Sequence, residues 1–120
     1  MPTTKSVSVE INFPDDDSVI TQISKRRVKV SNGESVILEW TIPAGKGSFH
    51  ETNPFTWNTS ATNPAPPTVT RVSNGKLEST EYTNTVQGET SLTWHYTLRV
   101  VRDLAAVSID PEVDNEAPPH

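Results

Sequence analysis

Hydrophobic and polar residues alternate strictly along several stretches of the chain. Between residues 7 and 13 every second position is apolar, and serine, glutamate and asparagine fill the positions between. The same period of two recurs in residues 36–42 and, over the longest run, in residues 92–100. Successive side chains of a β-strand point to opposite faces of its sheet, so each run predicts a strand with one buried face. No stretch has the spacing of an amphipathic helix, and the pattern predicts an all-β protein.

Two Asn-Gly dipeptides, at 32–33 and 74–75, lie between alternating segments. Asn-Gly tolerates the positive φ angles of a two-residue type I′ turn, which joins antiparallel strands. The dipeptides therefore predict two hairpins, one pairing residues 26–31 with 34–42 and one pairing 68–73 with 76–86.

Residues 43–67 differ from the alternating segments because they contain five prolines. Proline has no N–H to donate to a strand ladder, so we expect a loop with one short edge strand near 55–59. About seven short strands and no helix then favour one antiparallel Greek-key sandwich of two sheets, immunoglobulin-like, over residues 1–110. Trp40 and Trp94 are expected to fill its centre, and a small closed β-barrel is the alternative. Residues 111–120 are acidic and rich in proline, and we expect a flexible tail there.

Composition narrows the classes of function. None of the 120 residues is cysteine, which excludes disulfides, thiolate metal sites and a cysteine nucleophile. The net charge of −5 argues against nucleic acid as the main partner. The chain has no apolar run long enough for a membrane span and no signal-peptide pattern. We therefore expect a cytoplasmic protein, with export by a leaderless route as the alternative.

Catalytic motifs are missing from the sequence. It has no nucleophile elbow, no glycine-rich phosphate loop and no metal-hydrolase histidine pair. His50, His95 and His120 share no close spacing. We expect a protein that is not an enzyme and needs no cofactor, the other possibility being an enzyme whose site is assembled from distant residues.

The best candidate for a partner-binding surface is the proline-rich stretch, with Phe49, His50, Phe55 and Trp57. Aromatic rings bury a large area at a small loss of side-chain entropy, and prolines order a loop in advance. We expect these residues to bind a protein partner or a second copy, with an edge strand as a second route. Alternatively the rings fold back and cap one end of the sandwich, in which case Trp57 is the one expected to stay partly exposed.

A carbohydrate is the second kind of ligand that this stretch suits. Many lectin sandwiches hold sugar on an aromatic platform beside asparagine or aspartate side chains. Trp57, Asn53 and Asn58 would supply those groups.

Calcium is a third possibility, because clustered acids on loops supply the oxygen ligands that it takes. One cluster is Asp15-Asp16-Asp17. The other consists of Asp110, Glu112, Asp114 and Asn115, in a segment from Ile109 to Pro118 that is similar to the calcium-binding linker ending a cadherin repeat. That resemblance implies a calcium site at these four residues, and solvated acidic loops are the alternative.

The sequence holds one basic run, Lys25-Arg26-Arg27, at the start of a predicted strand. Charged side chains there protect a sheet edge from mispairing. Contact with phosphates is the alternative role of these three residues.

A further resemblance rests on two short motifs. Trp40-Thr41-Ile42 precedes a loop containing phenylalanine, and Asp-Pro-Glu-Val-Asp-Asn follows the last predicted strands. Over residues 26–115 the chain resembles small uncharacterised bacterial proteins with immunoglobulin-like or cupredoxin-like sandwiches that end in Asp-Pro-x-Val/Ile-x-Asn. The resemblance implies a sandwich fold in a bacterial protein, and it implies no activity.

Overall fold

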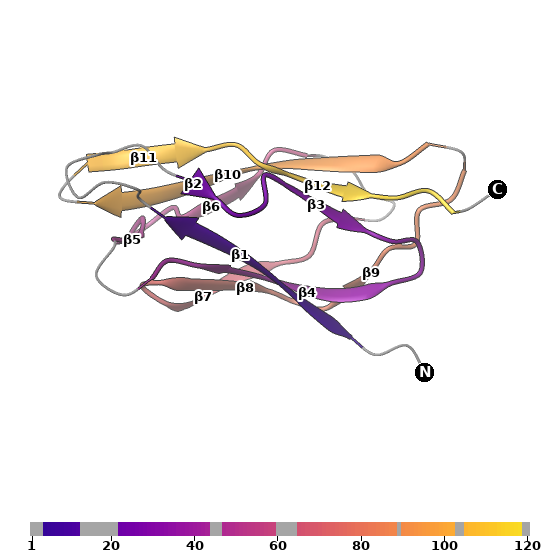
Figure 1. The fold of residues 1–120 in the computed structure, drawn as a ribbon, viewed down its shortest axis with the longest axis horizontal. Helices are drawn as coiled ribbons and strands as arrows, with labels where there is room; N and C mark the ends of the chain where they lie inside the picture. The colour runs from indigo at the N-terminus through magenta and orange to yellow at the C-terminus, as the bar shows by residue number, and fades with distance from the viewer. Residues whose placement is uncertain are drawn as a thin grey trace.

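The computed structural model describes residues 4–12, 22–43, 47–59, 65–88, 90–102 and 105–118. Across these ranges the chain forms two β-sheets and no helix. The sheets lie face to face (Figure 1). Buried side chains from both sheets fill the space between them. The predicted all-β sandwich is confirmed, and the alternative of a closed barrel is wrong because the sheets remain separate.

The first sheet has the strand order β2-β1-β4-β8-β7, and β9 pairs with β4 beyond the end of β8. Its strands are β1 (Lys5–Asn12), β2 (Gln22–Ile23), β4 (Ser35–Thr41), β7 (Val69–Ser73), β8 (Lys76–Ser79) and β9 (Tyr82–Thr83). β1 and β4 are parallel, so this sheet is mixed, and the expectation of purely antiparallel pairing is wrong.

The second sheet is built around β10, its longest strand. Its strands are β3 (Arg27–Val30), β5 (Ser48–Phe49), β6 (Phe55–Trp57), β10 (Leu92–Arg102), β11 (Ala105–Ile109) and β12 (Glu112–Asn115). β11 and β12 pair with β10 in one unbroken antiparallel register, and β3 is parallel to β12. β5 and β6 occupy the opposite edge of β10. Several of these strands have only two to four residues, which is why the described chain contains more than the seven expected.

The core combines the alternating residues of both sheets. Trp40, Trp94 and Tyr96 are fully buried, as predicted for the two tryptophans. The Trp40 indole Nε1 donates to the Tyr96 hydroxyl at 3.0 Å and so joins β4 to β10 across the sandwich. Burial of an aromatic ring with a satisfied polar atom stabilises the contact between the sheets.

The hairpin predicted around Asn32-Gly33 is wrong. β3 pairs with β12 in the second sheet, whereas β4 lies in the first, so the turn crosses between sheets. Gly33 does adopt a positive φ of 82°. Its N–H donates to the carbonyl of Asn84 at 2.8 Å. The dipeptide does form a turn, in which the Glu34 N–H donates to the Ser31 carbonyl at 3.0 Å, but packing across the whole molecule decides which strands pair.

The hairpin around Asn74-Gly75 is confirmed in part. β7 and β8 pair antiparallel, with a bulge between Arg71 and Ser73, but the pairing ends at Ser79. Gly75 approaches the first sheet closely, because a Cβ there would lie 3.1 Å from the carbonyl oxygen of Ile42, a tight contact.

The flexible tail predicted from residue 111 is also wrong. Residues 112–115 form β12, which lies between β10 and β3, and Val113 and Asn115 are fully buried. Acidic residues alternate there with inward-facing ones, so composition concealed a strand. The domain therefore extends past the expected boundary at 110. Within the described ranges, no helix is long and apolar enough to cross a membrane.

Candidate functional site

The proline-rich stretch predicted as a binding loop contributes two short strands, and its aromatic rings turn inward. Phe49 is 2% exposed and belongs to the core, so its expected contact with a partner is wrong. Phe55 and Trp57 are half-buried and pack against that core. His50 is also half-buried, and its Nδ1 accepts from the Asn53 N–H at 3.1 Å.

Trp57 lies in a cluster of aromatic rings. Its ring centroid is 5.5 Å from those of Trp94 and Tyr96, and 4.8 Å from that of Phe55. The indole Nε1 donates to the Pro67 carbonyl at 2.8 Å. These contacts favour the alternative in which the rings cap the sandwich.

The residues suggested for a sugar platform are engaged within the protein. Asn58 Nδ2 donates to Thr97 Oγ1 at 2.6 Å, and Asn53 Oδ1 accepts from Thr56 Oγ1. Trp57 is held by the neighbouring rings and by its hydrogen bond to Pro67. This arrangement leaves the carbohydrate hypothesis without a preformed platform.

The four residues suggested for calcium do not converge. Asp110 accepts from Thr97 Oγ1 at 2.8 Å, and Glu112 pairs with Arg27. Asn115 is buried on the inner face of β12, opposite to the outward Glu112 and Asp114. Within the described ranges, no three histidine or acidic side chains are grouped to hold a metal ion. The cluster Asp15-Asp16-Asp17 lies outside the described residues.

A polar group lies between the sheets near Trp94. The Tyr82 hydroxyl donates to Asn115 Oδ1 at 3.1 Å, and burial raises the pKa of Tyr82 well above its usual range. Trp94 Nε1 and Asn115 Nδ2 are buried without a hydrogen-bond partner among the described residues. The hydrogen bond between Tyr82 and Asn115 ties β9 to β12, so these two side chains link the two sheets.

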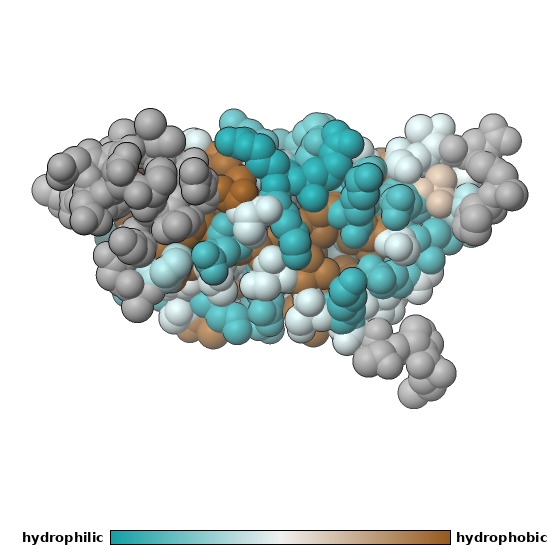
Figure 2. Space-filling view, viewed as in Figure 1, coloured by the Kyte–Doolittle hydropathy of each residue, from teal (hydrophilic) through white to brown (hydrophobic). Residues whose placement is uncertain are grey.

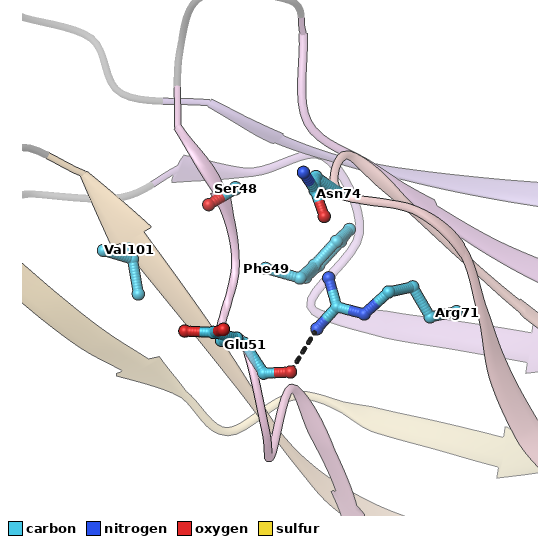
Figure 3. A pocket seen from close by; sticks show the side chains of 6 residues that line it. All are labelled: Ser48, Phe49, Glu51, Arg71, Asn74 and Val101. Carbon is cyan, nitrogen blue, oxygen red and sulfur yellow. Dashed lines mark hydrogen bonds between the residues drawn. The ribbon is translucent and has the colours of Figure 1, made fainter.

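A pocket of about 520 Å³ lies where β5 meets the β7–β8 turn (Figure 3). It is lined by Ser48, Phe49, Glu51, Arg71, Asn74 and Val101. The Arg71 guanidinium donates to the carbonyl oxygens of His50 and Glu51. Arg71 therefore holds the chain that follows β5, and its charge is already directed at the protein's own carbonyls.

A second hollow runs between β1 of the first sheet and β3 of the second. We call it the basic groove, and its volume is about 340 Å³. Its lining residues are Lys5, Ser6, Val7, Lys25, Arg27, Val28 and Lys29. Val7 and Val28 are buried, whereas the four cationic residues are exposed. Figure 2 shows the face on which β1 and β3 lie, with brown apolar atoms visible between teal polar ones.

The groove concentrates positive charge on an acidic protein. Four of the ten lysines and arginines line it, although the net charge is −5. Arg27 Nε donates to Glu112 Oε1 at 2.7 Å, and that hydrogen bond raises the pKa of Arg27. Among the described residues, Lys5, Lys25 and Lys29 have no carboxylate within ion-pair distance. Within the described ranges, these three lysines therefore form no ion pair.

The backbone along the groove is open as well. The N–H groups of Glu112 and Glu116 donate to the carbonyls of Arg26, just before β3, and of Val30, its last residue, so the backbone groups of these two residues face β12. Because backbone groups alternate in direction along a strand, those of Arg27 and Lys29 face away from β12, into the groove. In the described part of the chain, no strand pairs with this edge of β3.

The edge of β1 is more nearly closed. The Ser24 N–H donates to the Glu10 carbonyl at 2.9 Å, and Lys25 Nζ reaches the Ser8 carbonyl at 3.4 Å. These contacts close one end of the groove and cover part of the β1 edge. β3 therefore offers the freer row of donors and acceptors.

Part of this site was visible in the sequence. The run Lys25-Arg26-Arg27 predicts protection of a sheet edge, and Arg27 does lie on the edge strand β3, which pairs only with β12 in the described part of the chain. Lys5 and Lys29 were missed because they are single charges on separate strands. Lys29 lies in the strand predicted over residues 26–31, whereas Lys5 precedes the alternation that begins at residue 7, and the fold alone shows that both border one groove.

Comparison with known proteins adds no relative: no protein-family model matches the chain, and no curated protein matches it. The resemblance to small bacterial sandwich proteins stays a prediction.

Proposed function

We propose that this protein is a non-enzymatic binding module that recognises a protein partner by adding a strand to the open edge of β3. The observation that carries the proposal is that edge itself. Arg27 and Lys29 have backbone groups that no strand in the described part of the chain pairs with, beside a hollow with an apolar floor. Strand addition uses such groups for affinity and the neighbouring side chains for specificity.

The edge of β3 is a better site than the aromatic stretch. Phe49 is in the core, and Phe55 and Trp57 contribute to the ring cluster over β10. A partner that bound those rings would have to displace packing that stabilises the fold. The β3 edge requires no rearrangement of the core.

Mapping backbone amides by NMR tests this proposal. We suggest three capped seven-residue peptides in which valine alternates with threonine, with glutamate or aspartate, or with lysine. At least one should shift the amide resonances of Arg27 and Lys29 and slow their hydrogen exchange. Amides of residues 50–57 serve as the internal control and should be unaffected.

Two outcomes would contradict the proposal. One is a set of shifts confined to residues 50–57, which would return the site to the aromatic stretch. The other is the absence of any shift along β3 with all three peptides.

A further inference from the structure

β12 shows which kind of strand β3 accepts. It pairs with β3 so that Glu112 lies opposite Arg27 and Asp114 lies opposite Lys29. These acids and cations are on the outer face of the sheet, while Val113 and Val28 both face inward and are buried. Opposite charges directly across two strands stabilise their pairing. β3 is thus already matched on one side by alternating acidic and inward-facing residues.

The open side of β3 presents the same set of side chains. Side chains stand roughly perpendicular to a sheet, so Arg27 and Lys29 flank a strand on either side of β3. Val28 and Val7 provide the apolar floor, and Lys5 and Lys25 add positive charge. A strand placed there meets cations on its outer face and valines on its inner face.

We infer that the basic groove binds an extended acidic segment of a partner protein, one in which acidic and apolar residues alternate. This inference rests on the proposed function and specifies its partner. The acids would lie beside Arg27, Lys29 and the two other lysines, and the apolar residues would cover Val7 and Val28.

A second copy of the chain is a poorer occupant. Pairing β3 with β3 would set Arg27 and Lys29 against the same cations of the other molecule, and like charges directly opposite destabilise a sheet. Lysines on an edge strand are a common protection against such pairing. The charges that disfavour a second copy attract an acidic strand.

Nucleic acid is also a poorer occupant. Proteins that bind single strands combine a positive groove with aromatic rings on which the bases stack. Among the described residues, the basic groove is lined by two valines and a serine besides its cations, and none of these lining residues is aromatic. Its backbone edge matches a peptide.

The test uses fluorescence anisotropy with a labelled, capped peptide, Thr-Glu-Val-Asp-Val-Glu-Thr, at low salt. The control peptide replaces its three acids by lysine. The acidic peptide should bind and the lysine peptide should not. Binding should weaken as salt is raised, because exposed charges are screened.

Two variants with the same change in net charge locate the interaction. Lys29→Ala removes a charge from the groove, whereas Lys76→Ala removes one from β8, where Lys76 lies within 3.8 Å of Glu39 and Glu78. An exposed ion pair contributes about 0.2–1 kcal/mol, so Lys29→Ala should weaken binding about 1.5- to 5-fold. Lys76→Ala should leave it unchanged. Lys29→Glu should lower the affinity for the acidic peptide further than Lys29→Ala does, and it should raise the affinity for the lysine peptide.

The outcomes separate this inference from the proposed function. If all three peptide chemistries protect the Arg27 and Lys29 amides equally, strand addition stands and acidic selectivity is wrong. If the acidic peptide binds without affecting those amides, the proposed function is wrong. Equal effects of Lys29→Ala and Lys76→Ala, or displacement of the peptide by an equimolar single-stranded oligonucleotide, would overturn the inference.

Discussion

Asn84 is fully buried, and both ends of its amide are bonded. Its Nδ2 donates to the carbonyls of Val30 and Glu116, each at 2.9 Å, and its Oδ1 accepts from the Val86 N–H at 3.0 Å. Val30 ends β3 and Glu116 follows β12, whereas Asn84 follows β9 in the other sheet. This single side chain therefore ties the two sheets together at one end of the sandwich.

Replacing Asn84 by leucine should lower the free energy of unfolding by about 2–4 kcal/mol. The substitution preserves approximate volume but removes three hydrogen bonds and leaves the buried Val86 N–H without its partner, which is costly. The Val30 and Glu116 carbonyls each keep one other donor, the Glu116 N–H and Asn32 Nδ2. Urea unfolding at 25 °C measures the change. Asn53→Leu, on an exposed turn, is the control and should stay within about 0.5 kcal/mol of the parent. Similar losses for both variants would show that Asn84 has no special role.

Tyr96 makes the free energy of unfolding depend on pH in the alkaline range. Burial raises its pKa from 10.0 to about 12, so the unfolded chain loses this proton at a lower pH than the folded protein does. The contribution is complete below pH 10 and is lost as pH rises from 10 towards 12. The urea midpoint should fall over that interval, and it should fall less steeply in Tyr96→Phe. Equal slopes for the two proteins would contradict this assignment.

At the level of strands, sequence alternation predicted structure well and pairing poorly. Residues 92–100 lie within β10, and residues 36–42 overlap β4 over all but its first residue, because a buried face imposes a period of two that can be seen locally. The pairing of β3 with β12 joins segments about 85 residues apart, and no local pattern encodes it. Composition misled at residues 112–115, where acidic residues concealed a buried strand.

For the candidate site, too, the local features could be predicted from the sequence and the long-range arrangement could not. The Lys25-Arg26-Arg27 run and the strand beginning at residue 7 were both apparent in the sequence. Their convergence depends on the crossing of the chain from β2 in one sheet to β3 in the other. The aromatic stretch looked like a surface because prolines indicated a loop, yet two short strands turn its rings onto β10.

The packing of β6 against the core should depend strongly on Trp57. Removing the ring in Trp57→Ala takes away its contacts with Phe55, Trp94 and Tyr96 and its hydrogen bond to Pro67. For a half-buried tryptophan we expect a loss of about 2–3 kcal/mol in the free energy of unfolding. Chemical denaturation measures it. An unchanged unfolding curve would contradict this role and would favour Trp57 as a surface residue available for binding.

On the scale of the whole molecule, the sandwich carries a net negative charge, and no strand among the described residues pairs with the outer edge of β3. Its cations gather where β1 and β3 border the basic groove, and three of the lysines there have no carboxylate partner among the described residues. An uneven charge distribution of this kind steers oppositely charged partners and raises their association rate. The fold thus places an open strand edge and a favourable field at one location.

The most direct test of strand addition compares Lys29→Pro with Lys29→Ala. Both remove the charge, but only proline removes the Lys29 N–H, which faces the groove and forms no ladder bond to β12. Proline is tolerated at such positions of edge strands, so both variants should fold, as circular dichroism will show. We predict that Lys29→Pro abolishes binding of the acidic peptide while Lys29→Ala only weakens it. Equal affinities of the two folded variants would contradict recognition through the β3 edge.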